Sequence, residues 1–362
     1  MIRTTCPTPS DGVLLIFFGE PETAELSAAT DFLSRIFLAN ARLESPVDAA
    51  AAGRRSRELA AKRAPGLVRD YERIGGSPLH RQAHAQRARL AAELAGRGRP
   101  IPVELGMQFT EPRIDRAIGT LASMAVRRIV ALPVYPLCGP STTIAGLDVA
   151  RTAASRRETP IETLEVTGWH AHPSYVELRA AAIRSAAADA GLDLRAPHVQ
   201  LVFSAHGTPV RYIAEGSRYA TYVEQYCALV AGRLGLTDHV LGYQNHANRG
   251  IDWTRPPIDE VLDALPPGTA VLVDPVSFMH EQSETLSELD LDLREHAKKR
   301  GLGFHRVPVP HSDPRFVTLL ADLAETALGF APAGFPTPRV CGCRPGAAVC
   351  LNGETRPGVQ TG

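Results

Sequence analysis

His206 and Glu284 are the two residues whose types and surroundings most directly indicate chemistry. His206 ends the run Leu-Val-Phe-Ser-Ala-His at residues 201–206, which predicts a buried parallel strand. The last side chain of such a strand lies at the carboxyl edge of its sheet, where open α/β folds bind ligands. Glu281, Glu284 and Glu288 recur at spacings of three and four and therefore share one face of a predicted helix. A histidine facing such a carboxylate can move protons or hold a divalent cation.

These residues alone also allow interpretations in which they have no catalytic role. A histidine at a strand end can be satisfied by a backbone carbonyl, and carboxylates at a helix start complement the helix dipole. The second explanation suits Glu281 well. It suits Glu284 less well if the helix starts in a cleft beside His206.

Cysteines form a second group with chemical potential. The chain has six, of which Cys341, Cys343 and Cys350 crowd into the tail and Cys138 lies in a mid-chain loop. In a chain without an export signal, clustered cysteines are typical of metal or cluster ligands before disulfides. Cys6 stands alone, and Cys227 lies on an apolar predicted helix, which favours a buried core position.

Strands and helices must alternate to position these residues. Strands are predicted at residues 13–18, 103–107, 128–134 and 161–166, and again at 199–203, 240–243, 270–273 and 303–307. Helical segments lie between them, one of which, at residues 47–71, is predicted to break near Pro65. This alternation predicts an α/β fold with parallel four-stranded sheets in two similar halves. We expect domains at residues 1–168 and 169–330 and a short Cys-containing tail at 331–362, which cannot build a core on its own.

Composition excludes several function classes. Acidic and basic residues balance at 39 each, so no long-range field favours nucleic acid or an anionic membrane as a partner. Neither a Walker-type nor a Gly-x-Gly-x-x-Gly sequence follows a predicted strand, and no Gly-x-Ser-x-Gly turn occurs. The apolar run near the start is too short for a membrane span and lacks a basic segment before it. We therefore expect a soluble, cytoplasmic enzyme.

Six segments spread over nearly the whole chain carry a family resemblance. Phe-Ser-Ala-His at residues 203–206 and Glu-Thr-Leu at 284–286 are the most specific of the motifs. The full set is residues 13–23, 71–78, 132–136 with 141–143, 203–207, 242–244 with Trp253, and 283–290. With these motifs the chain resembles the ferrochelatases, lyase-class metal chelatases that insert ferrous iron into a porphyrin as the last chemical step of haem formation.

The resemblance implies two Rossmann-like, chelatase-type domains with the porphyrin in the cleft between them. His206 matches the family's invariant histidine and is expected to accept the pyrrole protons. Glu284 matches its catalytic glutamate, and both residues suit ferrous iron as ligands. Glu281 and Glu288 would extend an acidic path for iron or protons. Matching substrate positions are Phe18, Tyr135, Trp253 and Phe278 in the cleft, and Arg63 and Ser77 at the propionates.

Three departures from the family pattern concern metal delivery and substrate positioning. Gln108 and Phe109 stand where many relatives carry Arg-Tyr. Gln282 replaces a histidine two residues before the catalytic glutamate, although His280 lies nearby. The Gly75-Gly76-Ser77-Pro78 turn is one glycine shorter than in relatives.

The tail resembles the cluster-binding extension of those ferrochelatases that carry a 2Fe-2S centre. Cys341, Cys343 and Cys350 would supply three thiolates and Cys138 the fourth. A zinc site with the same ligands is the main rival to this interpretation.

The sequence leaves the identity of the porphyrin, the metal and the partners more open than the type of reaction. Protoporphyrin IX is favoured as the porphyrin, and coproporphyrin III or a different tetrapyrrole and metal come second. A non-catalytic tetrapyrrole-binding protein is the candidate from a different class. Membrane contact is expected to be peripheral at most, and the protein to be a monomer or homodimer.

Overall fold

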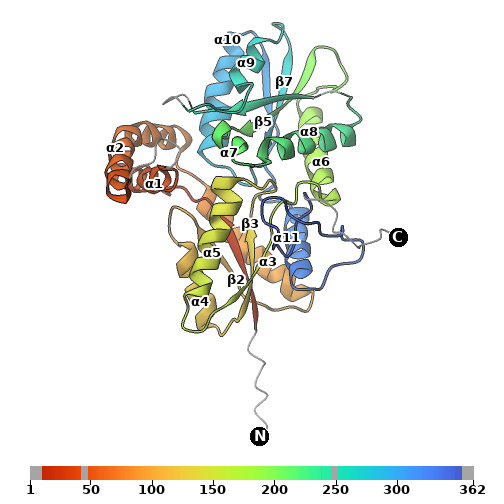
Figure 1. The fold of residues 1–362 in the computed structure, drawn as a ribbon. Helices are drawn as coiled ribbons and strands as arrows, with labels where there is room; N and C mark the ends of the chain where they lie inside the picture. Colours follow the sequence, from red (N-terminus) through yellow and green to blue (C-terminus); the bar gives the residue numbers. More distant parts are fainter. Residues whose placement is uncertain (1–9, 42–47, 238, 247–250, 353–362) are drawn as a thin grey trace.

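Two four-stranded parallel sheets form the framework of the protein (Figure 1). The structure is a computed structural model that describes residues 10–41, 48–237, 239–246 and 251–352; Cys6 lies outside this part of the chain. The first sheet has the order β2-β1-β3-β4 and the second the order β6-β5-β7-β8, so the two repeat one topology. This confirms the predicted pair of similar α/β halves. The strands are β1 (Asp11–Phe17), β2 (Val103–Met107), β3 (Arg128–Pro133), β4 (Glu162–Glu165), β5 (Val199–His206), β6 (Val240–Gln244), β7 (Ala270–Val276) and β8 (Gly303–Arg306).

Helices connect the strands and cover both faces of each sheet. They are α1 (Leu26–Ala39), α2 (Ala49–Ile74), α3 (Leu79–Gly96), α4 (Ile114–Ser123), η2 (Pro140–Ile144), α5 (Ala145–Ser155), α6 (Pro173–Asp189), α7 (Val210–Ala214), α8 (Tyr219–Leu234), α9 (Ile258–Asp263), η3 (Glu284–Leu293), α10 (Arg294–Lys299) and α11 (Pro314–Ala327). η2 and η3 are π-helices, which have a wider turn than α-helices.

Alternating apolar residues give each face of a sheet its own layer. On β1, Leu14 and Ile16 pack with α4 and α5, whereas Val13 and Leu15 pack toward α3 and α11. On β5, Val202 packs with α9, η3 and α10 on the opposite side from α6 and α8. The layer of α3, α6, α8 and α11 is one continuous core between the sheets. The predicted domain limits at residues 168 and 330 remain a prediction.

α1 and α2 form an arm that stands apart from the sheets, at the left of Figure 1. The predicted break at Pro65 does not occur, and α2 runs through this residue. Proline has no backbone N–H, so the carbonyl of Ala61, four residues earlier, lacks its usual helical donor. Ala61 and Pro65 are both exposed, so water can donate to this carbonyl instead. Although α2 has 26 residues, no helix in the described part of the chain is long and apolar enough to cross a membrane.

The tail after α11 docks onto the first half of the chain. Val349 forms a parallel bridge with Val166, directly after β4. The amide of Thr167 donates to the carbonyl of Val349 (2.9 Å) and that of Leu351 to Gly168 (2.8 Å). Cys341, Ala347, Val349, Cys350 and Leu351 are buried in the central core. The tail therefore gains a core by packing on the sheets.

One buried arginine binds the tail to this sheet. The guanidinium of Arg344 makes a bidentate contact with Glu165, at 2.6 Å from Nε and 2.7 Å from Nη2. Its Nη1 also contacts Asp148 at 2.6 Å, and Arg151 approaches Glu165 from the solvent side at 3.0 Å. We call Arg344, Glu165 and Asp148 the tail clamp.

Candidate functional site

A cavity of about 560 Å³ opens between the two halves, at the carboxyl ends of β1, β3, β5 and β7. Parallel sheets bind ligands at this end, because the chain leaves the strands there and polar groups can gather. α1, α2 and the start of η3 complete the walls. Of the residues predicted from the sequence, the lining contains Phe18, Arg63, Tyr135, His206, Trp253, Phe278, Glu284 and Glu288. Ser77 and Glu281 do not belong to the described lining.

His206 is the last residue of β5 and lines the cavity half-buried. Its Nδ1 lies 2.7 Å from the carbonyl oxygen of Gly207. Because a carbonyl only accepts, Nδ1 carries the hydrogen, and Nε2 of the neutral ring has the lone pair that can accept a proton. The backbone carbonyl of His206 in turn accepts from the Tyr219 hydroxyl at 3.0 Å, which fixes the end of the strand.

Two further rings surround this histidine. The centroid of His246 lies 5.2 Å from that of His206, and the centroid of Trp253 lies 6.5 Å from it. His246 and Trp253 contact each other edge to face at 5.4 Å. The backbone amide of Thr254 donates to Thr208 at 3.0 Å, so the loop that carries Trp253 is bound to the chain just after β5.

Glu284 begins the π-helix η3 and is oriented by its two preceding residues. Its Oε2 accepts from Nε2 of Gln282 at 3.0 Å and lies 3.0 Å from the Ser283 hydroxyl. Gln282 thus donates to the carboxylate at the position where many relatives have a histidine.

Glu288 lies four residues further along η3 and also lines the cavity. Its Oε2 accepts from Nε2 of Gln244 at 3.1 Å. Burial, with a contribution from the charge of Glu284, raises the pKa of Glu288 to about 8. Glu281 takes a different direction, because it precedes the helix: it pairs with Arg306 (3.1 Å) and accepts from the Thr285 hydroxyl (2.7 Å).

Glu20 is a buried carboxylate of the first half that reaches the same place. It is 3% exposed and accepts from the Ser77 hydroxyl at 2.5 Å. Across the cavity it accepts from the backbone amide of Ser283 at 3.2 Å and from the Ser283 hydroxyl. Burial, followed by the charge of Glu284, raises its pKa to about 7. The phenol of Tyr71, also buried beside this group, has its pKa raised by burial and then by the charge of Glu20.

Aromatic side chains make the rest of the cavity wall apolar. Phe18 packs against Phe109 and Phe32 with centroid distances of 4.7 and 6.2 Å. Phe109 therefore fills the space beside Phe18 with a ring. Burial raises the pKa of Tyr135 well above its ordinary value, and the phenol stays neutral. Arg63 is exposed at the cavity rim, on α2.

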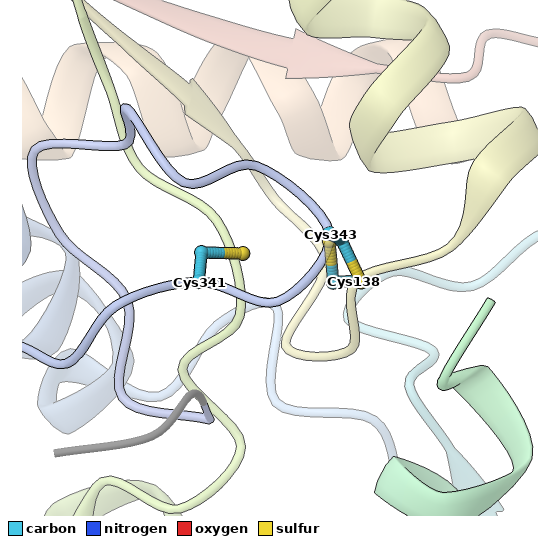
Figure 2. Close-up of side chains that lie close together, drawn as sticks. All are labelled: Cys138, Cys341 and Cys343. Atoms are coloured by element: carbon cyan, nitrogen blue, oxygen red, sulfur yellow. The ribbon is translucent and has the colours of Figure 1, made fainter. Parts of the chain in front are cut away.

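Cys138 stands between the lining residues Leu137 and Gly139 and lies close to Cys341 and Cys343 of the tail (Figure 2). The sulfur atoms of Cys138, Cys341 and Cys343 all lie within 4.8 Å of one another, and Cys350 is buried in the same core but is not one of this group. A hydrogen bond from Cys138 lowers the pKa of Cys341 to about 6 and that of Cys343 to about 3. The Tyr222 hydroxyl lies 4.0 Å from Sγ of Cys343. The three gathered thiols, two of them with a lowered pKa, offer sulfur ligands that suit a thiophilic metal.

Comparisons with known proteins decide the family. The sequence model of the family described as Ferrochelatase matches residues 10–328. The chain belongs to the ferrochelatase family. A ferrochelatase of Synechococcus sp. (strain JA-3-3Ab) is 34% identical over 339 residues, covering 90% of this chain and 96% of the relative. The ferrochelatase of Gloeobacter violaceus is 30% identical and covers 88% and 98%.

Among solved structures, SirB from Bacillus subtilis with Fe3+ matches this ferrochelatase-family chain with a TM-score of 0.49. It is 11% identical and covers 89% of the chain and 98% of SirB.

Glu20 and His246 are polar lining residues of this ferrochelatase-family site to which the sequence alone assigned no role. Glu20 lies three residues beyond β1, and His246 two residues beyond β6. Both follow strand ends, as His206 does, so the position that identified His206 was also available for them. Cys227 is buried in the central core, as predicted.

Proposed function

We propose that the protein is a ferrochelatase that inserts ferrous iron into a porphyrin and releases two protons. The observation that carries this proposal is the arrangement of His206 and Glu284 on the wall of one apolar cavity, in a chain of the ferrochelatase family. A flat, apolar macrocycle suits a cavity walled by aromatic rings. The metal and the protons require the few polar groups that the same wall contains.

His206 is the proposed general base. Two pyrrole N–H protons must leave as iron enters, and Nε2 is the ring nitrogen with a lone pair, because Nδ1 donates to Gly207. The Tyr219 contact holds the strand end and keeps this nitrogen in a fixed place. Trp253 and His246 limit access of water on the side of the ring that they cover.

Glu284 is proposed to accept the second proton or to bind the incoming iron. Its carboxylate suits ferrous iron, as does a histidine nitrogen. Glu288 follows on the same helix, and burial raises its pKa to about 8, so near neutral pH it exchanges protons readily. Glu281 is paired with Arg306, so of the three carboxylates predicted on this helix Glu284 and Glu288 are the two that can form the acidic path.

Charge in the cavity favours protoporphyrin IX over coproporphyrin III. Within the described lining, Arg63 is the only Arg or Lys, and it lies at the rim. One cationic edge suits a macrocycle with two carboxylates on one side. Four carboxylates around the ring would bring some of them against Phe18, Phe32 and Leu33, where an unpaired charge is costly. Ser77 binds Glu20 and does not line the cavity, so its proposed propionate contact has less support.

An insertion assay under anaerobic conditions tests the function. Purified protein is mixed with ferrous iron and either protoporphyrin IX or coproporphyrin III, and product formation is followed by absorption. We expect turnover when ferrous iron is supplied together with protoporphyrin IX, the porphyrin with two carboxylates. Binding of porphyrin without turnover under any of these conditions would instead identify a non-catalytic tetrapyrrole-binding protein.

We further propose that Cys138, Cys341, Cys343 and Cys350 hold a 2Fe-2S cluster. When bound, such a cluster would crosslink the tail to the loop after β3 and supply a redox-active centre. Support comes from the three thiols that gather within 4.8 Å and from the lowered pKa of Cys341 and Cys343. Hydrogen bonds with Cys341 raise the pKa of Cys138 and Cys350, so these two thiols would have to lose their protons on binding the cluster. Anaerobically purified protein should then contain iron and sulfide in equal amounts and absorb in the visible. A colourless protein with one zinc per chain would overturn the cluster.

As to setting, we propose that this lyase-class reaction takes place in the cytoplasm, in a monomer or homodimer. The balanced charge of the chain provides no long-range attraction to an anionic membrane or to nucleic acid, which is consistent with this setting.

A further inference from the structure

Glu20 makes a connection across the cavity that nothing in the reaction outlined above uses. It belongs to the segment after β1, in the first half of the chain, whereas Ser283 immediately precedes η3 in the second half. The carboxylate of Glu20 accepts from both the backbone amide and the hydroxyl of Ser283. On its other side it accepts from Ser77, at the turn between α2 and α3.

Ser283 is at the same time in contact with Glu284. Its hydroxyl oxygen lies 3.0 Å from Oε2 of Glu284, as well as in close contact with Glu20. A serine hydroxyl has one hydrogen, so it cannot donate to both carboxylates at once. The closer contact with Glu20, together with the backbone amide bond to the same carboxylate, favours donation to Glu20. The hydrogen bond that Glu284 Oε2 then retains comes from Gln282, at 3.0 Å.

Loss of Glu20 would change this arrangement in a defined way. The Ser283 hydroxyl would turn its hydrogen toward Glu284, and the backbone amide of Ser283 would lose its acceptor. Glu284 would then be bound by two donors, and the turn from Gln282 to Glu284 would no longer be fixed to the opposite wall.

We propose that Glu20 is a positioning residue for Glu284 and acts through Ser283. By holding Ser283 from the opposite wall, it sets both the direction of the Glu284 carboxylate and its distance from a macrocycle bound between the two halves. This inference rests on the proposed iron insertion. Small displacements of a reacting group cost up to about a hundredfold in rate, so the expected effect is on turnover.

The experiment compares steady-state iron insertion into protoporphyrin IX by the wild type and by Glu20→Ala, with porphyrin affinity measured by fluorescence. We expect kcat to fall by about tenfold to a hundredfold while KM and the porphyrin Kd change by less than about threefold. Glu20→Gln keeps the size and an acceptor oxygen for Ser283, and should restore kcat to within about threefold of the wild type. Glu25→Ala is the matched control: this glutamate of the same segment is exposed and its side chain makes no cap hydrogen bond to α1, so its removal should leave kcat unchanged.

A double-mutant cycle tests whether Glu20 acts through Ser283. Ser283→Ala should lower kcat to a similar extent, and it carries the test if Glu20→Ala does not fold. Both substitutions remove the contact between the Ser283 hydroxyl and Glu20, although Ser283→Ala keeps the bond from the backbone amide, so the loss of kcat in the double variant should be smaller than the product of the two single losses. Multiplicative losses, or a Glu20→Ala variant with the kcat of the wild type, would overturn the inference. A wild type that does not insert iron would overturn the proposed function instead.

Discussion

The tail clamp offers a perturbation whose size follows from the structure. Arg344→Leu removes the guanidinium that binds Glu165 through two nitrogens, in a place where Glu165 is only 5% exposed. Breaking a buried ion pair by removing one partner costs about 3–5 kcal/mol. Arg151 still reaches Glu165 at 3.0 Å, so we expect the lower end, about 3 kcal/mol.

Hydrogen exchange measures this energy where it acts. The amides of Thr167 and Leu351 donate across the junction between β4 and the tail, so they are protected only while the tail is docked. A loss of about 3 kcal/mol corresponds to roughly a hundredfold in an equilibrium constant, so both amides should exchange about a hundred times faster in protein freed of metal. The amides of β1 should keep their protection, because the tail does not pair with that strand.

The matched control is Arg151→Leu, which removes the exposed partner of the same carboxylate. The Arg151 side chain is 56% exposed, and surface pairs contribute about 0–1 kcal/mol, so exchange should change by no more than about fivefold. Exchange of Thr167 and Leu351 in Arg344→Leu within about threefold of the wild type would refute the reasoning and show that the strand pairing alone holds the tail.

Three further predictions concern the site. His206→Ala should abolish iron insertion while circular dichroism and porphyrin binding are retained; turnover like that of the wild type would exclude His206 as the base. Cys341→Ser should remove the bound metal, measured by elemental analysis, whereas Cys227→Ser should leave the metal content unchanged, and equal losses in the two variants would contradict the assigned ligands. Because the folded-state pKa of Glu288 is raised to about 8 from 4.5, the folded protein holds a proton that the unfolded chain has lost, so the free energy of unfolding should decrease by about 3 kcal/mol as pH rises from about 5 to about 7.5. Glu288→Gln, which keeps an acceptor for Gln244, should remove this part of the dependence in urea titrations at the two pH values and leave the part that the raised pKa of Glu20 contributes, and an unchanged slope would contradict burial of Glu288 as its cause.

The sequence predicts the framework because buried parallel strands have a simple signature. Apolar runs such as residues 13–17 and 201–203 leave little choice but a strand covered on both faces. The position of His206 at the cavity follows from this, because the carboxyl end of a central strand lies at the edge of the sheet where such folds bind ligands. The family motifs then add Glu284, Trp253 and the aromatic walls.

The remainder of the site depends on packing that no local pattern encodes. Glu20 and Ser283 are 263 residues apart, and only the folded chain brings them together. The spacing of Glu281, Glu284 and Glu288 predicts an ordinary α-helix. In the structure, however, Glu284 begins a π-helix and Glu281 precedes it and pairs with Arg306. In the tail, Arg344 sits among glycines and prolines that carry no helical or strand period, so its pairing with Glu165 could not be predicted.

The continuous core between the sheets makes folding of the two halves a shared event. α11 is the last helix of the described chain, yet it packs on α3 from the first half as well as on α6 from the second. Neither half can complete its hydrophobic layer before α11 has been synthesised, because that layer needs residues such as Phe316 and Leu320. Although the sheets repeat one topology, we expect the two halves to fold as one cooperative unit. A ribosome-bound chain that has not yet released α11 would expose the apolar side of α3.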